Sequence, residues 1–183
     1  FVLDRIARAD AIFFAGGDQS DYVRDWQGTP LARAVQQAVA KRRVPVGGTS
    51  AGMMILGEIV FSAQFGSISS AEALANIDDP ALTLVRDVVD LPALAATVTD
   101  SHIVKRDRMG RLVTFMARSI LDRLTTLTAA RAIGVEAKTA LLIEGGVARV
   151  EGPGAVYFLR PLGAVPLRCS ADNPSLVFRN VEV

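Results

Sequence analysis

A serine and a histidine are the side chains in this sequence best suited to covalent chemistry. Ser50 lies in Gly48-Thr49-Ser50-Ala51-Gly52, after the short apolar segment 44–47 and before a helix-forming stretch. A G-x-S-x-G turn between a strand and a helix is typical of a nucleophile elbow, which lifts the serine Oγ clear of the sheet edge. The backbone N–H of Ala51 is then expected to face a developing oxyanion. His102 is the only histidine in the chain, so any Ser-His hydrolase here must use this pair.

Simpler interpretations compete with this one. The same pattern fits an ordinary strand-to-helix turn or a loop that cradles a phosphate, and a lone histidine is often a structural residue. A P-loop is excluded because its lysine is absent. An ordinary esterase or lipase is disfavoured, since the α/β-hydrolase order of serine, acid and histidine needs a later histidine.

Charged residues surround His102 in the sequence. They are Asp100, Arg106, Asp107, Arg108 and Arg111. Guanidinium groups at this density suit the recognition of carboxylates by forked hydrogen bonds. The alternative is a solvated loop in which Asp107 pairs with a neighbouring arginine.

The elements around these residues predict an α/β fold. Residues 11–15 and 44–47 read as buried parallel strands, and Thr29-Pro30 reads as the cap and first turn of a helix between them. A second amphipathic helix is predicted from about Gly110 to Arg123, whereas residues 58–92 read as loops or short helices over the site. Short C-terminal strands are predicted at 132–135, 140–143, 147–150, 155–159 and 176–183, as an antiparallel extension of the sheet.

Composition predicts one soluble domain over residues 1–183. Half of the residues are hydrophobic, and 20 basic against 19 acidic residues give a net charge of +1, which argues against nucleic acid as a partner. One cysteine, Cys169, and one histidine do not make a disulfide or the usual zinc site, so we expect no metal. No apolar run reaches the ~18 to 20 residues of a membrane span. Because the chain opens at Phe1 with the tail of a helix, we expect an opening strand and any export signal to be missing, and the compartment stays open, with the cytoplasm favoured.

Three separated motifs then resemble one family. Residues 13–19, 48–52 and 99–112 are similar, in this order, to the cyanophycinase-like serine peptidases, which are relatives of dipeptidase E. Residues 69–76 and 134–141 also resemble stretches of that family. The resemblance covers nearly the whole chain and lacks only the expected opening strand.

The resemblance implies a class I glutamine amidotransferase-like, flavodoxin-like fold with a mostly parallel sheet flanked by helices. It implies that Ser50 is the nucleophile and His102 its base, with Gly17 and Ala51 at the oxyanion hole. The family's substrate-binding residues carry over onto Gln19, Asp100, Arg106, Arg108 and Arg111. It further implies an aspartyl peptide or cyanophycin-type substrate, no cofactor, and a homodimer.

The sequence departs from the family at two places. Where the family has an Asp-Glu pair, this chain has Glu136-Ala137, so we expect Glu136 to replace the acid that orients His102. Ser101 stands where the family has a larger polar residue, such as Gln or Thr. The main hypothesis is therefore a serine peptidase that cleaves aspartyl peptide bonds. The alternative is a catalytically impaired homologue that binds acidic peptides or metabolites, and a glutamine amidotransferase domain is disfavoured because Ser50 replaces its cysteine.

Overall fold

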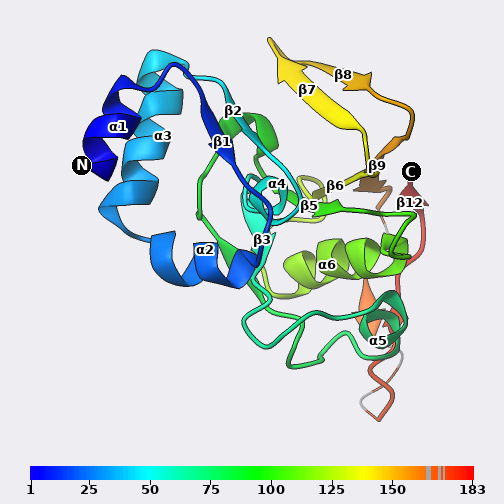
Figure 1. Ribbon diagram of the computed structural model, residues 1–183. Coiled ribbons are helices and arrows are strands. Elements are labelled where there is room, and N and C mark those ends of the chain that lie inside the picture. Colours follow the sequence, from blue (N-terminus) through cyan, green and yellow to red (C-terminus); the bar gives the residue numbers. More distant parts are fainter. Residues whose placement is uncertain (164–165, 169, 171) are drawn as a thin grey trace.

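The N-terminal part of the chain builds a parallel strand pair with helices beside it. The computed structural model describes residues 1–163, 166–168, 170 and 172–183, so Cys169 lies outside the described residues. The elements of this part are α1 (Val2–Arg8), β1 (Ile12–Phe14), α2 (Gln19–Trp26), α3 (Pro30–Arg42) and β2 (Val46–Gly48). β1 and β2 pair in parallel, which requires the chain to cross over between them through α2 and α3. Figure 1 shows α1 and α3 side by side at the N-terminal end.

Local sequence explains where the two longer helices of this part begin and end. The Asp18 side chain accepts a hydrogen bond from the Ser20 N–H at 2.8 Å and caps α2. Thr29 caps α3, which starts with Pro30 and is followed by its C-cap residue Arg43 in the left-handed conformation. The helix predicted after Thr29 is confirmed.

A six-stranded sheet forms the centre of the molecule, in the order β12-β9-β6-β5-β3-β4. Its strands are β3 (Ile59–Phe61), β4 (Leu84–Arg86), β5 (Thr97–Ser101), β6 (Arg131–Val135), β9 (Val156–Pro161) and β12 (Val181–Glu182). β5 runs parallel to both β3 and β6, whereas β4, β9 and β12 pair in antiparallel fashion. The α/β fold class is thus confirmed, with parallel strands beside the site and antiparallel strands toward the C-terminus.

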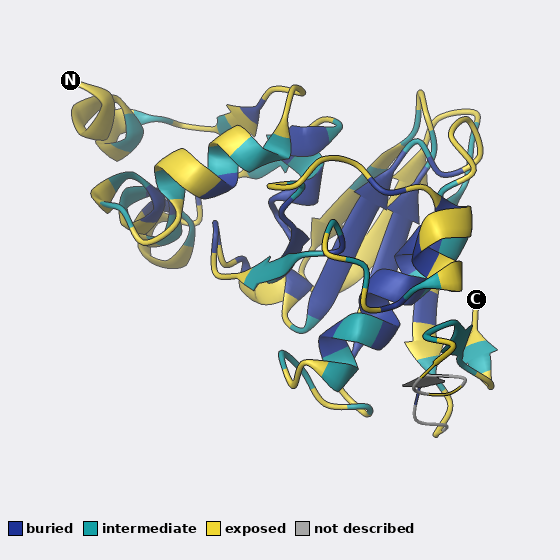
Figure 2. Ribbon diagram, turned by 90° about the horizontal axis from the view of Figure 1, so that it is seen from below, coloured by how far each residue is buried: buried dark blue, intermediate teal, exposed yellow. Residues whose placement is uncertain are grey.

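Apolar packing covers both faces of this sheet. On one face, Leu112, Phe115 and Met116 of α6 (Met109–Leu121) are fully buried against the sheet, and α5 (Ser70–Ala75) lies beside α6. A second cluster joins Phe14, Val35 and other residues of the N-terminal part to the opposite face. Figure 2 shows the central strands buried and the N-terminal helices largely exposed. β5 is therefore held from both sides, which fixes the residues at its carboxyl end.

The remaining elements are short helices and strands outside the central sheet. They are the four-residue helix α4 (Ala51–Met54), η1 (Pro92–Leu94), the hairpin β7 (Ala140–Glu144) and β8 (Val147–Glu151), and the pair β10 (Leu167–Arg168) and β11 (Leu176–Val177). The β7–β8 hairpin is a separate two-stranded sheet that extends away from the body of the molecule, so the strands predicted at 140–143 and 147–150 exist but do not extend the central sheet (Figure 1). The region predicted as loops, residues 58–92, also contributes strands β3 and β4 to the sheet. Its short apolar stretches did not stand out as strands in the sequence because both strands have only three residues.

No helix of the described part is long and apolar enough to cross a membrane.

Candidate active site

Ser50 occupies a sharp turn between β2 and α4. Its backbone angles are φ 53° and ψ −121°, a conformation that non-glycine residues seldom adopt. The flanking glycines fit because there is no room for side chains: a Cβ at Gly48 would collide with the backbone of Gly52, and a Cβ at Gly52 with the backbone of Phe14. The sequence pattern therefore produces the geometry of a nucleophile elbow.

His102 reaches the same place from the end of β5. Its Nε2 lies 3.1 Å from the Ser50 Oγ, although the two residues are 52 positions apart in the chain. This distance is within hydrogen-bond reach for proton transfer from the hydroxyl. Both side chains are partly exposed, so a substrate has access to them.

The loop after β1 runs beside the elbow. The Thr49 N–H donates to the Phe14 carbonyl at 3.1 Å, and a Cβ at Gly16 would contact the Ser50 Cβ. This arrangement brings the loop that carries Gly17 near Ser50, and it places Ala51 at the first position of α4, where backbone N–H groups have no intrahelical acceptor. The proposed oxyanion donors thus belong to segments that meet at the nucleophile.

Gln19 follows that loop as the first residue of α2 and is partly buried. Its side chain makes no hydrogen bond to another described residue. It remains a candidate for binding a polar group of the substrate.

Asp100 and Arg111 lie in the core, contrary to the role in substrate binding expected from the sequence. Asp100 is completely buried, and Arg111 donates to both of its carboxylate oxygens, at 2.6 and 2.7 Å. The Arg111 guanidinium also lies over the rings of Phe61 and Phe115, at 5.6 and 5.4 Å from their centres. We therefore assign Asp100 and Arg111 a structural role, because their charged groups hydrogen-bond to each other.

Arg108 is the third member of this network. Its Nη1 donates to the Ser101 carbonyl at 3.0 Å and approaches the nearer Asp100 oxygen at 3.3 Å. The same Asp100 oxygen accepts from the Ser101 N–H at 2.8 Å. Burial lowers the pKa of Arg108 to about 10, so its guanidinium remains charged at neutral pH. Arg108 thus faces the backbone before His102 instead of open solvent.

Lys105 and Arg106 form the exposed cationic rim of the site. The Arg106 N–H donates to the His102 carbonyl at 3.0 Å, so the segment makes a helical turn that starts at His102. Residues three and four positions apart in such a turn lie on one side, next to His102. Neither cationic side chain pairs with another described residue. The rim is therefore free to bind an anion.

The electrostatic setting of His102 follows from this arrangement. Its pKa is lowered from the ordinary value mainly by burial, then by the positive charges of Arg106, Arg108 and Lys105, while Asp100 opposes these effects. A lowered pKa keeps the imidazole neutral, and so able to accept a proton, over a wider range of pH.

Glu136 is engaged away from His102. Its two carboxylate oxygens accept the Tyr157 hydroxyl at 2.7 Å and the Ala155 N–H at 3.1 Å. Within the described part of the chain, Ser50 is the sole hydrogen-bond partner of the His102 side chain. The structure therefore does not bring Glu136 into the orienting role expected from the sequence, because its hydrogen bonds tie the end of β6 to β9.

Two further residues of this region, Lys105 and Tyr157, were not predicted from the sequence. Lys105 lies within the run of charges that pointed to anion binding, and its spacing from His102 is the signal that could have identified it. Tyr157 carried no such signal, because only the register of β6 with β9 brings it opposite Gly134 and close to Glu136.

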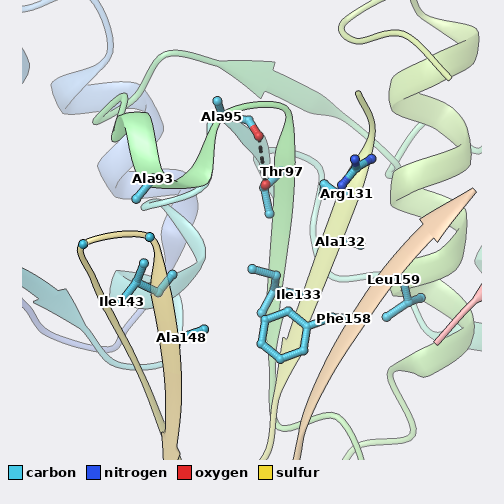
Figure 3. Close-up of a pocket in the computed structure, with 12 residues that line it drawn as sticks. Ala93, Ala95, Thr97, Arg131, Ala132, Ile133, Ile143, Ala148, Phe158 and Leu159 are labelled. Carbon is cyan, nitrogen blue, oxygen red and sulfur yellow. Dashed lines mark hydrogen bonds between the residues drawn. The ribbon is translucent and has the colours of Figure 1, made fainter. Parts of the chain in front are cut away.

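A separate cavity of about 460 Å³ lies away from Ser50 and His102. Figure 3 shows it between the turn of the β7–β8 hairpin and the sheet, with Thr97 and Arg131 at the start of β5 and β6. His102 follows the other end of β5. Large apolar side chains, including Phe158 and Ile143, line the cavity, which does not contribute to the chemistry of Ser50.

Comparisons with known proteins agree with the motifs and geometry. The model of peptidase family S51 matches residues 2–150. Cyanophycinases of Synechococcus elongatus and Thermosynechococcus vestitus are each 30% identical over 161 residues, covering 87% of this chain and 44% of each relative. A cyanophycinase of Trichormus variabilis is 28% identical over 151 residues, covering 82% of this chain and 45% of that protein. The chain thus spans less than half the length of these relatives, and the match over most of its own length shows that it belongs to peptidase family S51.

Proposed function

We propose that this chain carries the Ser-His centre of a serine peptidase that hydrolyses aspartyl peptide bonds. The observation that carries the proposal is the 3.1 Å approach of His102 Nε2 to Ser50 Oγ at a strained elbow. Membership of family S51 supports a peptidase, and the names of the relatives supply the cyanophycin-type substrate as one candidate.

The proposed reaction proceeds through an acyl-enzyme. The Ser50 Oγ attacks the scissile carbonyl while its proton passes to His102 Nε2, and the N–H groups of Ala51 and Gly17 stabilise the negative oxygen. The intermediate then expels the amine, which takes the proton from His102. Water, deprotonated by His102, hydrolyses the ester and regenerates Ser50. None of these steps needs a cofactor.

The free cations of the site favour a substrate with a carboxylate. Arg106 is exposed and unpaired beside His102, and Lys105 adds a second positive charge. Arg108 and Arg111 are turned to Asp100 instead. An aspartyl side chain or a free peptide carboxylate is therefore the group that the rim would bind, with Gln19 available for a polar group.

A second candidate is a catalytically impaired homologue that binds acidic peptides or metabolites. The engagement of Glu136 with Tyr157 favours it, because the imidazole then has no orienting carboxylate from this residue. Loss of the orienting acid lowers kcat by about 10⁴ in a serine protease without abolishing catalysis. Slow turnover is therefore compatible with the main proposal.

A dipeptide panel tests the choice between the two candidates. We would assay β-Asp-Arg, β-Asp-Lys, α-Asp-Leu and Ala-Ala for amine release, with Ser50→Ala as the matched control. The proposal expects cleavage of at least one aspartyl dipeptide, none of Ala-Ala, and complete loss in the Ser50→Ala protein. Binding of an aspartyl dipeptide by calorimetry without any cleavage would instead support the impaired homologue.

The predicted homodimer stays a proposal. Sedimentation equilibrium of the full chain measures its mass directly. A single species of the mass of one chain at all concentrations would reject a dimer.

A further inference from the structure

The backbone of Ser101, directly before His102, is held at both its N–H and its carbonyl. Its N–H donates to Asp100 Oδ1 at 2.8 Å, and its carbonyl accepts from Arg108 Nη1 at 3.0 Å. Arg108 Nη1 also lies 3.3 Å from the same Asp100 oxygen. We call these two side chains, Asp100 and Arg108, the backbone clamp.

The clamp is itself fixed in the core. Asp100 has no exposed surface, and Arg111 donates to both of its carboxylate oxygens. Ser70 accepts from the Arg111 N–H at 3.1 Å and donates to the Asp107 carbonyl, which ties the far end of the His102 loop to the same network. Charged hydrogen bonds with this many partners hold a single geometry.

His102 needs such support because its backbone is unfavourable. Its φ of 59° lies in the left-handed region, which is sterically unfavourable for a non-glycine residue. Residues in this conformation persist only where the surrounding structure over-determines them. Holding the Ser101 backbone at its N–H and its carbonyl keeps His102 in this conformation and its ring within reach of Ser50.

We propose that Asp100 and Arg108 position His102 through the backbone of Ser101, so that Arg108 is a positioning residue and does not bind the substrate carboxylate. This inference rests on the proposed Ser-His mechanism. It also explains how His102 stays aligned although Glu136 is bound to Tyr157 and Ala155. Orientation by the backbone replaces part of what a carboxylate on the imidazole provides.

The test compares Arg108→Gln with Arg108→Lys on two substrates. One substrate is the aspartyl dipeptide that turns over best, and the other is neutral p-nitrophenyl acetate, which offers no carboxylate to bind. Arg149→Gln, on the exposed face of the β7–β8 hairpin, removes one positive charge elsewhere and is the matched control. Thermal unfolding checks that each variant folds.

A positioning role lowers kcat for both substrates alike. We expect Arg108→Gln to reduce kcat about 10- to 100-fold with KM changed less than about twofold, because a small misplacement of a catalytic group costs up to about 10² in rate. Arg108→Lys keeps one donor for the Ser101 carbonyl and should recover part of the loss. A raised KM for the dipeptide alone, with ester turnover unchanged, would make Arg108 a substrate-binding residue and overturn the proposal.

The imidazole of His102 gives a readout that does not depend on turnover. Since it is the only histidine, its ring signals in an ¹H–¹⁵N NMR spectrum need no assignment. The proposal expects these signals to shift and broaden in Arg108→Gln, to return toward the wild type in Arg108→Lys, and to stay unchanged in Arg149→Gln. Unchanged signals in Arg108→Gln would overturn the clamp. Absence of Ser50-dependent turnover in the wild type would instead reject the proposed function.

Discussion

The carboxyl ends of β5 and β6 lie side by side in parallel, and each has an acidic residue that serves a different purpose. Asp100, at the end of β5, is fully buried and bound by two arginines and a backbone N–H. Glu136, just after β6, is partly exposed and binds Tyr157 and the backbone of β9. The first carboxylate binds the segment that leads to His102, whereas the second joins the end of β6 to the start of β9.

This difference shows that an acid near a histidine in the fold does not by itself complete a triad. β6 pairs with β5 up to Val135 opposite Ser101, so Glu136 directly follows β6 just as His102 directly follows β5. The partners of its carboxylate then decide its role. In this chain Asp100 and Arg108 bind the backbone directly before His102, and within the described residues no carboxylate binds the imidazole.

Removal of Asp100 should have the largest effect on stability. In Asp100→Ala the Arg111 charge remains buried without its partner, and breaking one side of a buried ion pair costs about 3 to 5 kcal/mol. The control is Asp4→Ala, which breaks the exposed Asp4–Arg8 pair and should cost less than about 1 kcal/mol. Urea denaturation followed by circular dichroism measures both free energies of unfolding. Equal losses in the two variants would show that Asp100 does not anchor the core.

Adding a carboxylate near the His102 imidazole should increase the rate of catalysis. Ala137→Glu places a carboxylate at the position where the related family pattern has one, and we expect kcat/KM to rise at least about tenfold, since an orienting acid is worth up to about 10⁴ in serine proteases. Ala137→Gln keeps the size without the charge and should not reproduce the gain.

The variant Glu136→Gln tests whether the carboxylate already present at this position orients His102. Because its carboxylate already binds Tyr157, we expect kcat/KM to change less than about threefold. A loss of 100-fold or more would mean that Glu136 orients His102 during catalysis.

The smallest effect concerns pH. The pKa of His102 is lowered by burial and by the nearby cations, and in the proposed mechanism its neutral form is the base. The rate kcat/KM should therefore rise with pH through a midpoint below the ordinary histidine value of about 6.5. Lys105→Gln removes one of the charges that lower the pKa, so its midpoint should move upward in a pH-rate profile. A midpoint that falls in this variant would contradict the assigned electrostatics.

Local sequence predicted the parts of the site that depend on short-range rules. The small residues around Ser50 predicted the elbow, because no Cβ fits at Gly48 or Gly52. Thr29-Pro30 predicted the start of α3. The family resemblance then pointed to His102, which the structure brings to Ser50.

The roles of the charged residues could not be predicted in the same way. Whether Asp100 and Arg111 face solvent or the core depends on how α6 packs on β5, and this contact is set by apolar residues elsewhere in the chain. The hydrogen bonding of Glu136 depends on the register of β6 with β9, because this register brings Tyr157, 21 residues away in the chain, to its carboxylate. The spacing of these residues in the sequence does not predict either long-range contact.

The central claim is that His102 activates Ser50, and a serine-directed fluorophosphonate tests it most directly. The account predicts one covalent adduct by intact-mass spectrometry, located on Ser50 by peptide mapping, absent in Ser50→Ala and formed at least about 100-fold more slowly in His102→Ala. Failure of the folded wild-type chain to react, or reaction at an equal rate without His102, would contradict the claim.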